Sequence, residues 1–138
     1  MSSEELKSLL KRITEEASNN GEYAVINELL APNFITHNFN VVPGPQGYIQ
    51  FLTLLRNAFP DFHIETEDMI AEGNKVVSRG TITGTHKGDF LNIMASGNKL
   101  EFTYIDLWRM EEGKFVESWL IADMLKLLQQ IEVAPQAD

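Results

Sequence analysis

Hydrophobic positions follow two different periods along the chain, and the change between them falls near residue 60. Before that point, apolar residues recur at helical spacing over 6–17, 22–30 and 48–59. Ser2 and Glu5 have the spacing of a capping box for the first of these helices. A short strand is expected between the second and third helices, at 34–37. The pattern therefore predicts an N-terminal half that is mainly helical.

Long segments of strand character dominate after residue 60. We expect strands over four ranges, 62–71, 74–87, 98–109 and 114–122, with a final short helix at 124–131. Helices followed by a run of strands predict an α+β fold, with the N-terminal helices packed in a strongly curved antiparallel β-sheet. Gly80 and Gly84 would allow the bending that makes such a sheet a cone with an internal pocket. The chain is expected to form one domain over 1–138, with a frayed tail at 132–138.

The predicted hairpin formed by the last two strands mixes aromatic rings with carboxylates. If its turn centres on Glu112 and Gly113, Met110 faces Phe115, and every second residue from there shares one side of the sheet. One side then carries Phe102, Tyr104, Asp106, Trp119, Ile121 and Asp123. The other side carries Ile105, Leu107, Val116 and Leu120, an ordinary apolar packing surface. The first side predicts a pocket, but a shift of one residue in the pairing would exchange the two sides.

The amino-acid composition argues against several classes of binding partner and of chemistry. The formal charge of −9, from 20 acidic and 11 basic side chains, would repel nucleic acid and anionic lipid. There are no cysteines, which excludes disulfides and thiolate chemistry. Because no apolar run approaches the roughly 20 residues of a membrane span and no targeting segment is evident, we expect a cytoplasmic protein.

Two aspartates and two histidines are the candidates for acid-base chemistry. Asp123 follows an apolar strand, a setting that raises a carboxyl pKa and suits a general base; alternatively it caps the helix that follows. Asp106 lies inside a predicted strand, where it would need a site or a partner, for which Arg79 is the candidate. His86 and His37 could donate or accept protons, or could be hydrogen-bonded residues of the pocket rim.

No cofactor or metal site is predicted. The three histidines are far apart in the sequence and lack the paired spacing of metal ligands. The segment Gly44-Pro45-Gln46-Gly47 lacks the lysine of a phosphate-binding loop, and there is no nucleophilic serine motif.

Several segments together resemble the SnoaL-like polyketide cyclase family, which belongs to the nuclear transport factor 2-like superfamily alongside ketosteroid isomerase. They are RGTITGTHKGDF at 79–90, IDLWRMEEGKFVESW at 105–119, Asp123, LLQQIE at 127–132, and His37-Asn38 followed by GPQG at 44–47. The resemblance implies an α+β cone that dimerises through the outer face of its sheet. It also implies that Asp123 acts as acid and base in an intramolecular aldol ring closure without metal or cofactor. Ser118 and Lys126 depart from the family, which often has His and Gly there.

The first functional hypothesis is a cofactor-independent cyclase or isomerase acting on a largely apolar, carbonyl-containing small molecule. Asp123 would remove a proton α to the carbonyl, and Asp106, His86 or His37 would donate a hydrogen bond to the enolate oxygen. Substrate contacts would come from Trp119, Tyr104, Phe102, Arg79 and Ile121. A non-catalytic module that binds a small ligand or another protein remains open, as does a hydrolase in which the same Asp activates water. We also expect a homodimer through the face that carries Ile105, Leu107, Val116 and Leu120.

Overall fold

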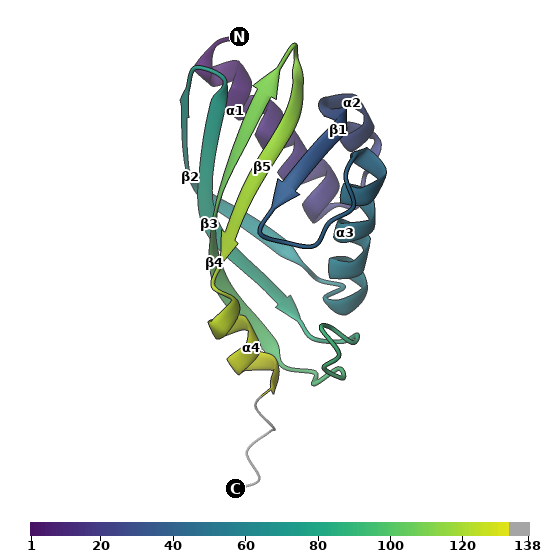
Figure 1. Ribbon diagram of the computed structural model, residues 1–138. Coiled ribbons are helices and arrows are strands. Elements are labelled where there is room, and N and C mark those ends of the chain that lie inside the picture. Colours follow the sequence, from purple (N-terminus) through teal and green to yellow (C-terminus); the bar gives the residue numbers. More distant parts are fainter. Residues whose placement is uncertain (133–138) are drawn as a thin grey trace, which may run out of the picture.

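The computed structural model of the protein describes residues 1–132, and Figure 1 shows its arrangement. The tail expected at 132–138 lies outside the described residues, except for Glu132, which ends the last helix. The helical elements are α1 (Ser3–Arg12), the π-helical η1 (Ile13–Asn19), α2 (Ala24–Leu29), α3 (Pro45–Ala58) and α4 (Met124–Glu132). The strands are β1 (Leu30–His37), β2 (His63–Glu72), β3 (Lys75–Thr85), β4 (Lys99–Glu111) and β5 (Lys114–Ala122).

The predicted capping box at the start of α1 is present. The Ser2 hydroxyl accepts a hydrogen bond from the Glu5 backbone N–H at 3.1 Å, and the Glu5 carboxylate accepts one from the Ser2 backbone N–H at 3.1 Å. The helix does not stop at Arg12, because η1 continues it as a π-helix. The Asn19 side chain then holds the end of η1 against β2, since its amide donates to the Ile64 carbonyl and its oxygen accepts from the Ile64 N–H.

The five strands form one open sheet in the order β1-β5-β4-β3-β2. The four long strands pair antiparallel, as predicted, but β1 runs parallel to β5, so the prediction of a wholly antiparallel sheet is wrong. The parallel pairing arises because β1 is inserted beside the last strand of the sheet rather than beside a sequence neighbour. As an edge strand, β1 can also accommodate Pro32. The sheet is twisted, with free edges at β1 and β2, rather than strongly curled into a cone.

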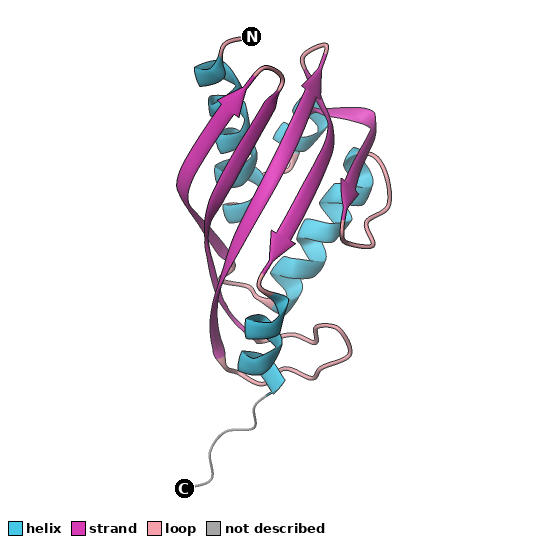
Figure 2. Cartoon of the chain, turned by 60° about the vertical axis from the view of Figure 1, so that its left-hand side comes forward, coloured by secondary structure: helices cyan, strands magenta, loops and turns pink. Residues whose placement is uncertain are grey.

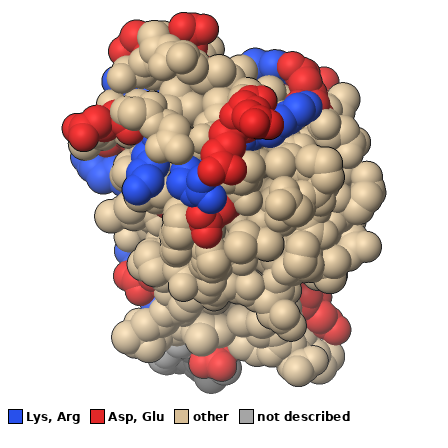
Figure 3. All heavy atoms as spheres, turned by 45° about the horizontal axis from the view of Figure 1, so that its top comes forward, with Lys and Arg blue, Asp and Glu red and all other residues tan. Residues whose placement is uncertain are grey.

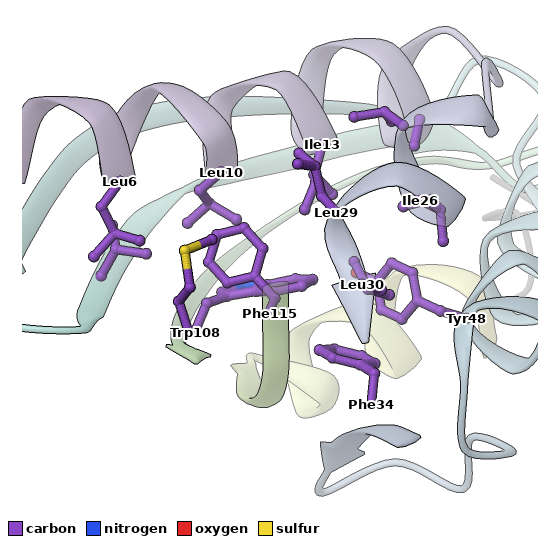
Figure 4. Packing of buried hydrophobic residues seen from close by; sticks show 14 of the residues in the cluster. Leu6, Leu10, Ile13, Ile26, Leu29, Leu30, Phe34, Tyr48, Trp108 and Phe115 are labelled. Atoms are coloured by element: carbon purple, nitrogen blue, oxygen red, sulfur yellow. The ribbon is translucent and has the colours of Figure 1, made fainter. Parts of the chain in front are cut away.

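The helices α1, η1, α2 and α3 cover one face of this sheet, which we call the inner face (Figure 2). A large apolar cluster fills the space between α1, α2, the start of α3 and the inner face. In it the Trp108 ring stacks on Phe34 with centroids 5.4 Å apart, and it meets Tyr48 and Phe115 edge-on (Figure 4). A second cluster joins the end of α3 to the sheet and α4. None of the helices within residues 1–132 is both long and apolar enough to cross a membrane.

A β-bulge in the β4–β5 hairpin reverses the predicted orientation of the β5 side chains. Met110 pairs with Phe115, as expected, but Arg109 pairs with Glu117, so that Val116 is an extra residue in β5. Beyond the bulge, Asp106 pairs with Leu120 and therefore shares its side of the sheet with Leu120. The expectation that Trp119 and Ile121 lie on the same side as Asp106 is wrong for this reason.

Candidate active site

A narrow cavity of about 90 Å³ lies between the inner face of the sheet and the helices. Its wall is mostly aromatic and aliphatic, and α3, β4, β5 and α4 supply most of it. The lining residues that matter below are Tyr48 from α3, Phe102, Tyr104, Asp106 and Trp108 from β4, and Leu120 from β5. Because apolar walls with a few polar groups are typical of small-molecule sites, this cavity is the candidate active site.

Asp106 is the only carboxylate in the wall of this cavity among the described residues. Burial raises its pKa to about 6, although the Ser78 hydroxyl and the Trp108 indole favour the charged form. The Ser78 hydroxyl donates to Asp106 Oδ1 at 2.5 Å. The side chain nevertheless keeps some accessible surface, since it faces the cavity. The result is a carboxyl group that can be present in both protonation states close to neutral pH.

Ser78 and Tyr104 connect Asp106 to a further hydroxyl. The Ser78 Oγ also lies within hydrogen-bonding distance of Tyr104 Oη, at 3.4 Å, and Tyr104 Oη lies 3.1 Å from Thr66 Oγ1. Burial raises the pKa of the Tyr104 phenol, so this hydroxyl stays neutral. The three hydroxyl groups come from β3, β4 and β2 respectively, and the close pairing of these strands brings them together.

One hydrogen-bond donor in the cavity wall, the Trp108 indole N–H, makes no hydrogen bond within the described residues, although it lies close enough to Asp106 to favour the charged carboxylate. The Trp108 side chain is 3% exposed, and its Nε1 is buried without a hydrogen-bond partner among residues 1–132. The Tyr48 hydroxyl also lines the cavity; burial, and then the nearby charge of Asp106, raise the pKa of this phenol. An unpaired buried donor is costly, so a ligand oxygen that accepts from Trp108 would be bound favourably.

Three of the predicted site residues lie in the cavity wall: Phe102, Tyr104 and Asp106. The sequence pattern found them because β4 alternates regularly on both sides of Asp106. It did not single out Tyr48, Thr66, Ser78 or Trp108. Trp108 could have been found, since it continues the same alternation by one more step, whereas Ser78 is an inconspicuous residue within an alternating apolar strand.

Four other predicted residues lie on the opposite, outer face of the sheet. The His37 ring stacks on Trp119 at a centroid distance of 4.9 Å, and its Nε2 lies 2.7 Å from a Glu117 carboxylate oxygen. Ile121 is 62% exposed. Arg79 does not pair with Asp106; it pairs with Glu67 and Asp68 at 3.5 and 3.3 Å, because regular alternation in β3 points it outward. The predicted cavity contacts of these residues are therefore not formed.

Asp123 caps α4 instead of facing the cavity. Its side chain is exposed, and its Oδ1 accepts a hydrogen bond from the Lys126 backbone N–H at 3.1 Å. This is the alternative that the sequence offered, and it follows from the position of Asp123 immediately before the helix. The acid-base role implied for Asp123 by the family resemblance stays a prediction, but it would require the side chain to turn from this cap.

His86 is fully buried, yet it is not part of the cavity wall. Its Nδ1 accepts the Ser96 backbone N–H at 3.1 Å, so the ring carries its proton on Nε2, which has no hydrogen-bond partner within the described part of the chain. The ring instead lies beside Phe59, with centroids 5.7 Å apart. Across residues 1–132, no three His, Asp or Glu side chains lie close enough together to hold a metal ion.

Comparison with known protein families gives one match, to the SnoaL-like polyketide cyclases, over residues 8–131. The chain belongs to this family. Its fold is accordingly the nuclear transport factor 2-like fold, in agreement with the resemblance noted in the sequence. No curated protein matches the chain.

Solved structures of similar proteins cover nearly the whole SnoaL-like chain. A candidate SnoaL-like polyketide cyclase from Jannaschia sp. CCS1 is 26% identical, with a TM-score of 0.88 over 96% of this chain and 95% of that one. IdmH, a candidate polyketide cyclase from Streptomyces antibioticus, is 26% identical, with a TM-score of 0.77 over 93% and 99%. AclR, a candidate hydroxylase from Streptomyces galilaeus, is also 26% identical, with a TM-score of 0.83 over 99% and 87%. Proteins with this fold are named for different activities. The chemistry therefore has to be inferred from the residues that line the cavity.

Proposed function

We propose that the cavity binds a small, largely apolar ketone and that Asp106 removes the proton α to its carbonyl group. The observation that carries this proposal is a carboxyl group with a pKa raised to about 6, set in an apolar wall beside one unpaired donor, the Trp108 indole N–H. A general base is most effective when its pKa lies near the working pH. Above pH 6 the carboxylate is available to accept the proton, and its apolar setting limits competition from water.

The Trp108 indole N–H and the Tyr48 hydroxyl would donate hydrogen bonds to the carbonyl oxygen, which becomes negatively charged as the enolate forms. Trp108 is suited to this role because three aromatic rings hold it in place and its N–H, although close to Asp106, makes no hydrogen bond within residues 1–132. In a ring closure, the enolate carbon would attack a second carbonyl of the same molecule. The proton held by Asp106 would then pass to the new alkoxide, leaving the enzyme unchanged.

The test is exchange of the α-protons of 1-tetralone for deuterium in D2O, followed by proton NMR. We expect Asp106→Asn to slow the enzyme-dependent exchange at least about 100-fold, since the amide keeps the shape but is not a base. Asp123→Asn is the matched control: Asn caps a helix about as well as Asp, so this variant should exchange at the wild-type rate. The wild-type rate should rise with pH and level off above about pH 6, as Asp106 loses its proton.

Two outcomes would contradict this assignment. If Asp123→Asn loses the exchange and Asp106→Asn keeps it, Asp123 is the base, as the family resemblance implies, and its side chain leaves the α4 cap during the reaction. If the wild-type protein binds 1-tetralone, as shown by shifts of the Trp108 indole signal, but exchanges no protons, the protein is a binding module instead. Between the two alternatives to the proposed reaction, the narrow cavity favours a binding module over a hydrolase, because it leaves little room for a reacting water molecule beside the ligand.

A further inference from the structure

A groove of about 410 Å³ runs along the outside of the molecule, between the helical segment formed by α1 and η1 and strand β2. Exposed charged side chains such as Glu65 and Asp68 line it, so it is open to solvent. Thr66 lines the same groove. The Thr66 hydroxyl is also the last of the hydroxyl groups that lead away from Asp106, so one chain of hydrogen bonds joins the cavity to this groove.

The sequence contains two features that bring Thr66 to this position. Gly80 pairs with both Thr66 and Tyr104, and a Cβ added to Gly80 would lie 2.0 Å from the Glu65 carbonyl oxygen. Only glycine therefore allows β2 to approach this closely. Immediately after Thr66, Glu67 is an extra residue in β2, so the strand is bulged there. Bulges of this kind commonly redirect side chains beside active sites.

We infer that Ser78, Tyr104 and Thr66 carry protons between Asp106 and solvent in the groove beside α1. The inference rests on the proposed function, because only an acid-base carboxyl needs to return its proton to water. Most of the remaining cavity wall is apolar, and none of its other hydroxyl residues, Thr14, Ser18 and Tyr48, is hydrogen-bonded to Asp106 in the described structure.

Ser78 has one hydroxyl hydrogen and two acceptors within reach, Asp106 Oδ1 at 2.5 Å and Tyr104 Oη at 3.4 Å. When Asp106 is charged, that hydrogen points to the carboxylate. When Asp106 has taken up a proton, it passes this proton to Ser78 Oγ while Ser78 passes its own to Tyr104. Tyr104 then passes its proton to Thr66, and Thr66 passes its proton to a water molecule in the groove. One proton reaches the solvent, and each hydroxyl group is neutral before and after.

The experiment measures proton exchange at Asp106 without any substrate. The protein is labelled with 13C at the aspartate carboxyl carbons, and the Asp106 signal is assigned by its loss in Asp106→Asn. At a pH close to the Asp106 pKa, relaxation dispersion of this signal gives the rate at which the carboxyl gains and loses its proton. We expect Thr66→Val, which removes the hydroxyl and keeps the shape, to slow this rate about ten-fold or more. Thr66→Ser, which keeps the hydroxyl, should restore the wild-type rate.

Thr103→Val serves as a control for the loss of a threonine hydroxyl. Thr103 is an exposed residue of β4, and its side chain makes no hydrogen bond to Ser78, Tyr104 or Thr66. A wild-type exchange rate in Thr66→Val would overturn the relay while leaving the proposed function in place. Equal slowing in Thr66→Val and Thr66→Ser would also overturn it, since altered packing would then be the cause. An Asp106 carboxyl that titrates at its ordinary value in the wild-type protein would contradict the proposed function itself, and the relay with it.

Discussion

Asp106 and Glu117 are carboxylates of the same hairpin, yet the two faces of the sheet give them opposite properties. On the inner face, burial raises the pKa of Asp106 to about 6. On the outer face, a hydrogen bond from His37 lowers the pKa of Glu117 most; burial opposes it by a smaller amount, and Arg109 lowers the pKa further. Arg109 Nε and His37 Nε2 lie 2.9 and 2.7 Å from the Glu117 oxygens. The comparison teaches that hydrogen-bond donors such as Arg109 hold a carboxylate in its charged form, whereas burial without a cation lets a carboxyl group keep its proton closer to neutral pH.

The largest effect is expected when Asp106 is replaced by Asn and the pH dependence of the free energy of unfolding is compared with that of the wild type. The folded protein holds this proton up to about pH 6, whereas the unfolded chain releases it near pH 4. The free energy of unfolding should therefore fall as pH rises through this window, by about 2 to 3 kcal/mol relative to Asp106→Asn. Urea unfolding of both proteins at pH 4 and pH 7.5 checks this. A difference that does not change with pH would show that Asp106 is not held in a low-dielectric site.

A somewhat smaller effect is expected when charges are placed on the outer face of the sheet, where we expect two copies of the chain to associate. Its apolar residues are Ile35, Ile105, Leu107, Trp119 and Ile121. Ile105 and Ile121 pair with each other across β4 and β5 and are 52% and 62% exposed. Figure 3 shows that charged side chains on the side it presents gather in its upper part, leaving a wide area below with few of them. Large apolar side chains that are exposed and paired on one face, as Ile105 and Ile121 are, are typical of an interface.

We expect the protein to sediment as a homodimer and the double variant Ile105→Glu, Ile121→Glu to raise the dimer dissociation constant about 10- to 100-fold. The matched control is Leu54→Glu, which places the same charge on an equally exposed leucine of α3, on the helical side of the molecule. Analytical ultracentrifugation at micromolar concentration measures the dimer dissociation constant of the wild type, the double variant and the Leu54→Glu control. The earlier expectation included Leu120 in this interface, but Leu120 lines the cavity. A monomeric wild-type protein would rule out the dimer.

The smallest effect is expected for Glu117→Gln. Because the pKa of Glu117 is lowered in the folded state, the charged side chain stabilises the fold above pH 5, and this contribution is lost as the pH falls through the folded-state pKa. Its partners are partly exposed to solvent, so the loss at pH 7 should be under about 1 kcal/mol. The difference from the wild type should shrink as the pH falls through the lowered pKa of Glu117, which is the reverse of the trend at Asp106. A loss that does not change as the pH falls would point to packing rather than charge.

The sequence predicted most of the fold because its signals are local. The capping residues of α1, the turn at Gly113 and the alternation of β4 each depend on a few neighbouring residues, and these features are present. The parallel partner of β1 could not be predicted in this way, since β1 and β5 are separated by most of the chain. Half of the candidate site was found for the same reason: Phe102, Tyr104 and Asp106 follow from the alternation of one strand.

The part of the site that comes from β5 depended on a bulge that the sequence does not mark. Neither Val116 nor Glu117 is a glycine or a proline. Their residue types therefore do not indicate that β5 has an additional, unpaired residue here. The shift sends Trp119 and Ile121 to the outer face and brings Leu120 and Ala122 to the cavity. Ser78 and Thr66 were missed because a hydroxyl network forms only when three strands are in register, a property of the assembled sheet.

The bulge at Val116 also bears on how such a protein can change over evolutionary time. Gaining or losing a single codon between this bulge and the end of β5 would exchange the ligand-facing and solvent-facing residues of the strand end in one step. Trp119 and Ile121 would then be tested by selection for contacts with a ligand, and Leu120 for contacts with a partner. Two chains that differ by such an event would align well by eye, yet they would present different chemistry to the same cavity.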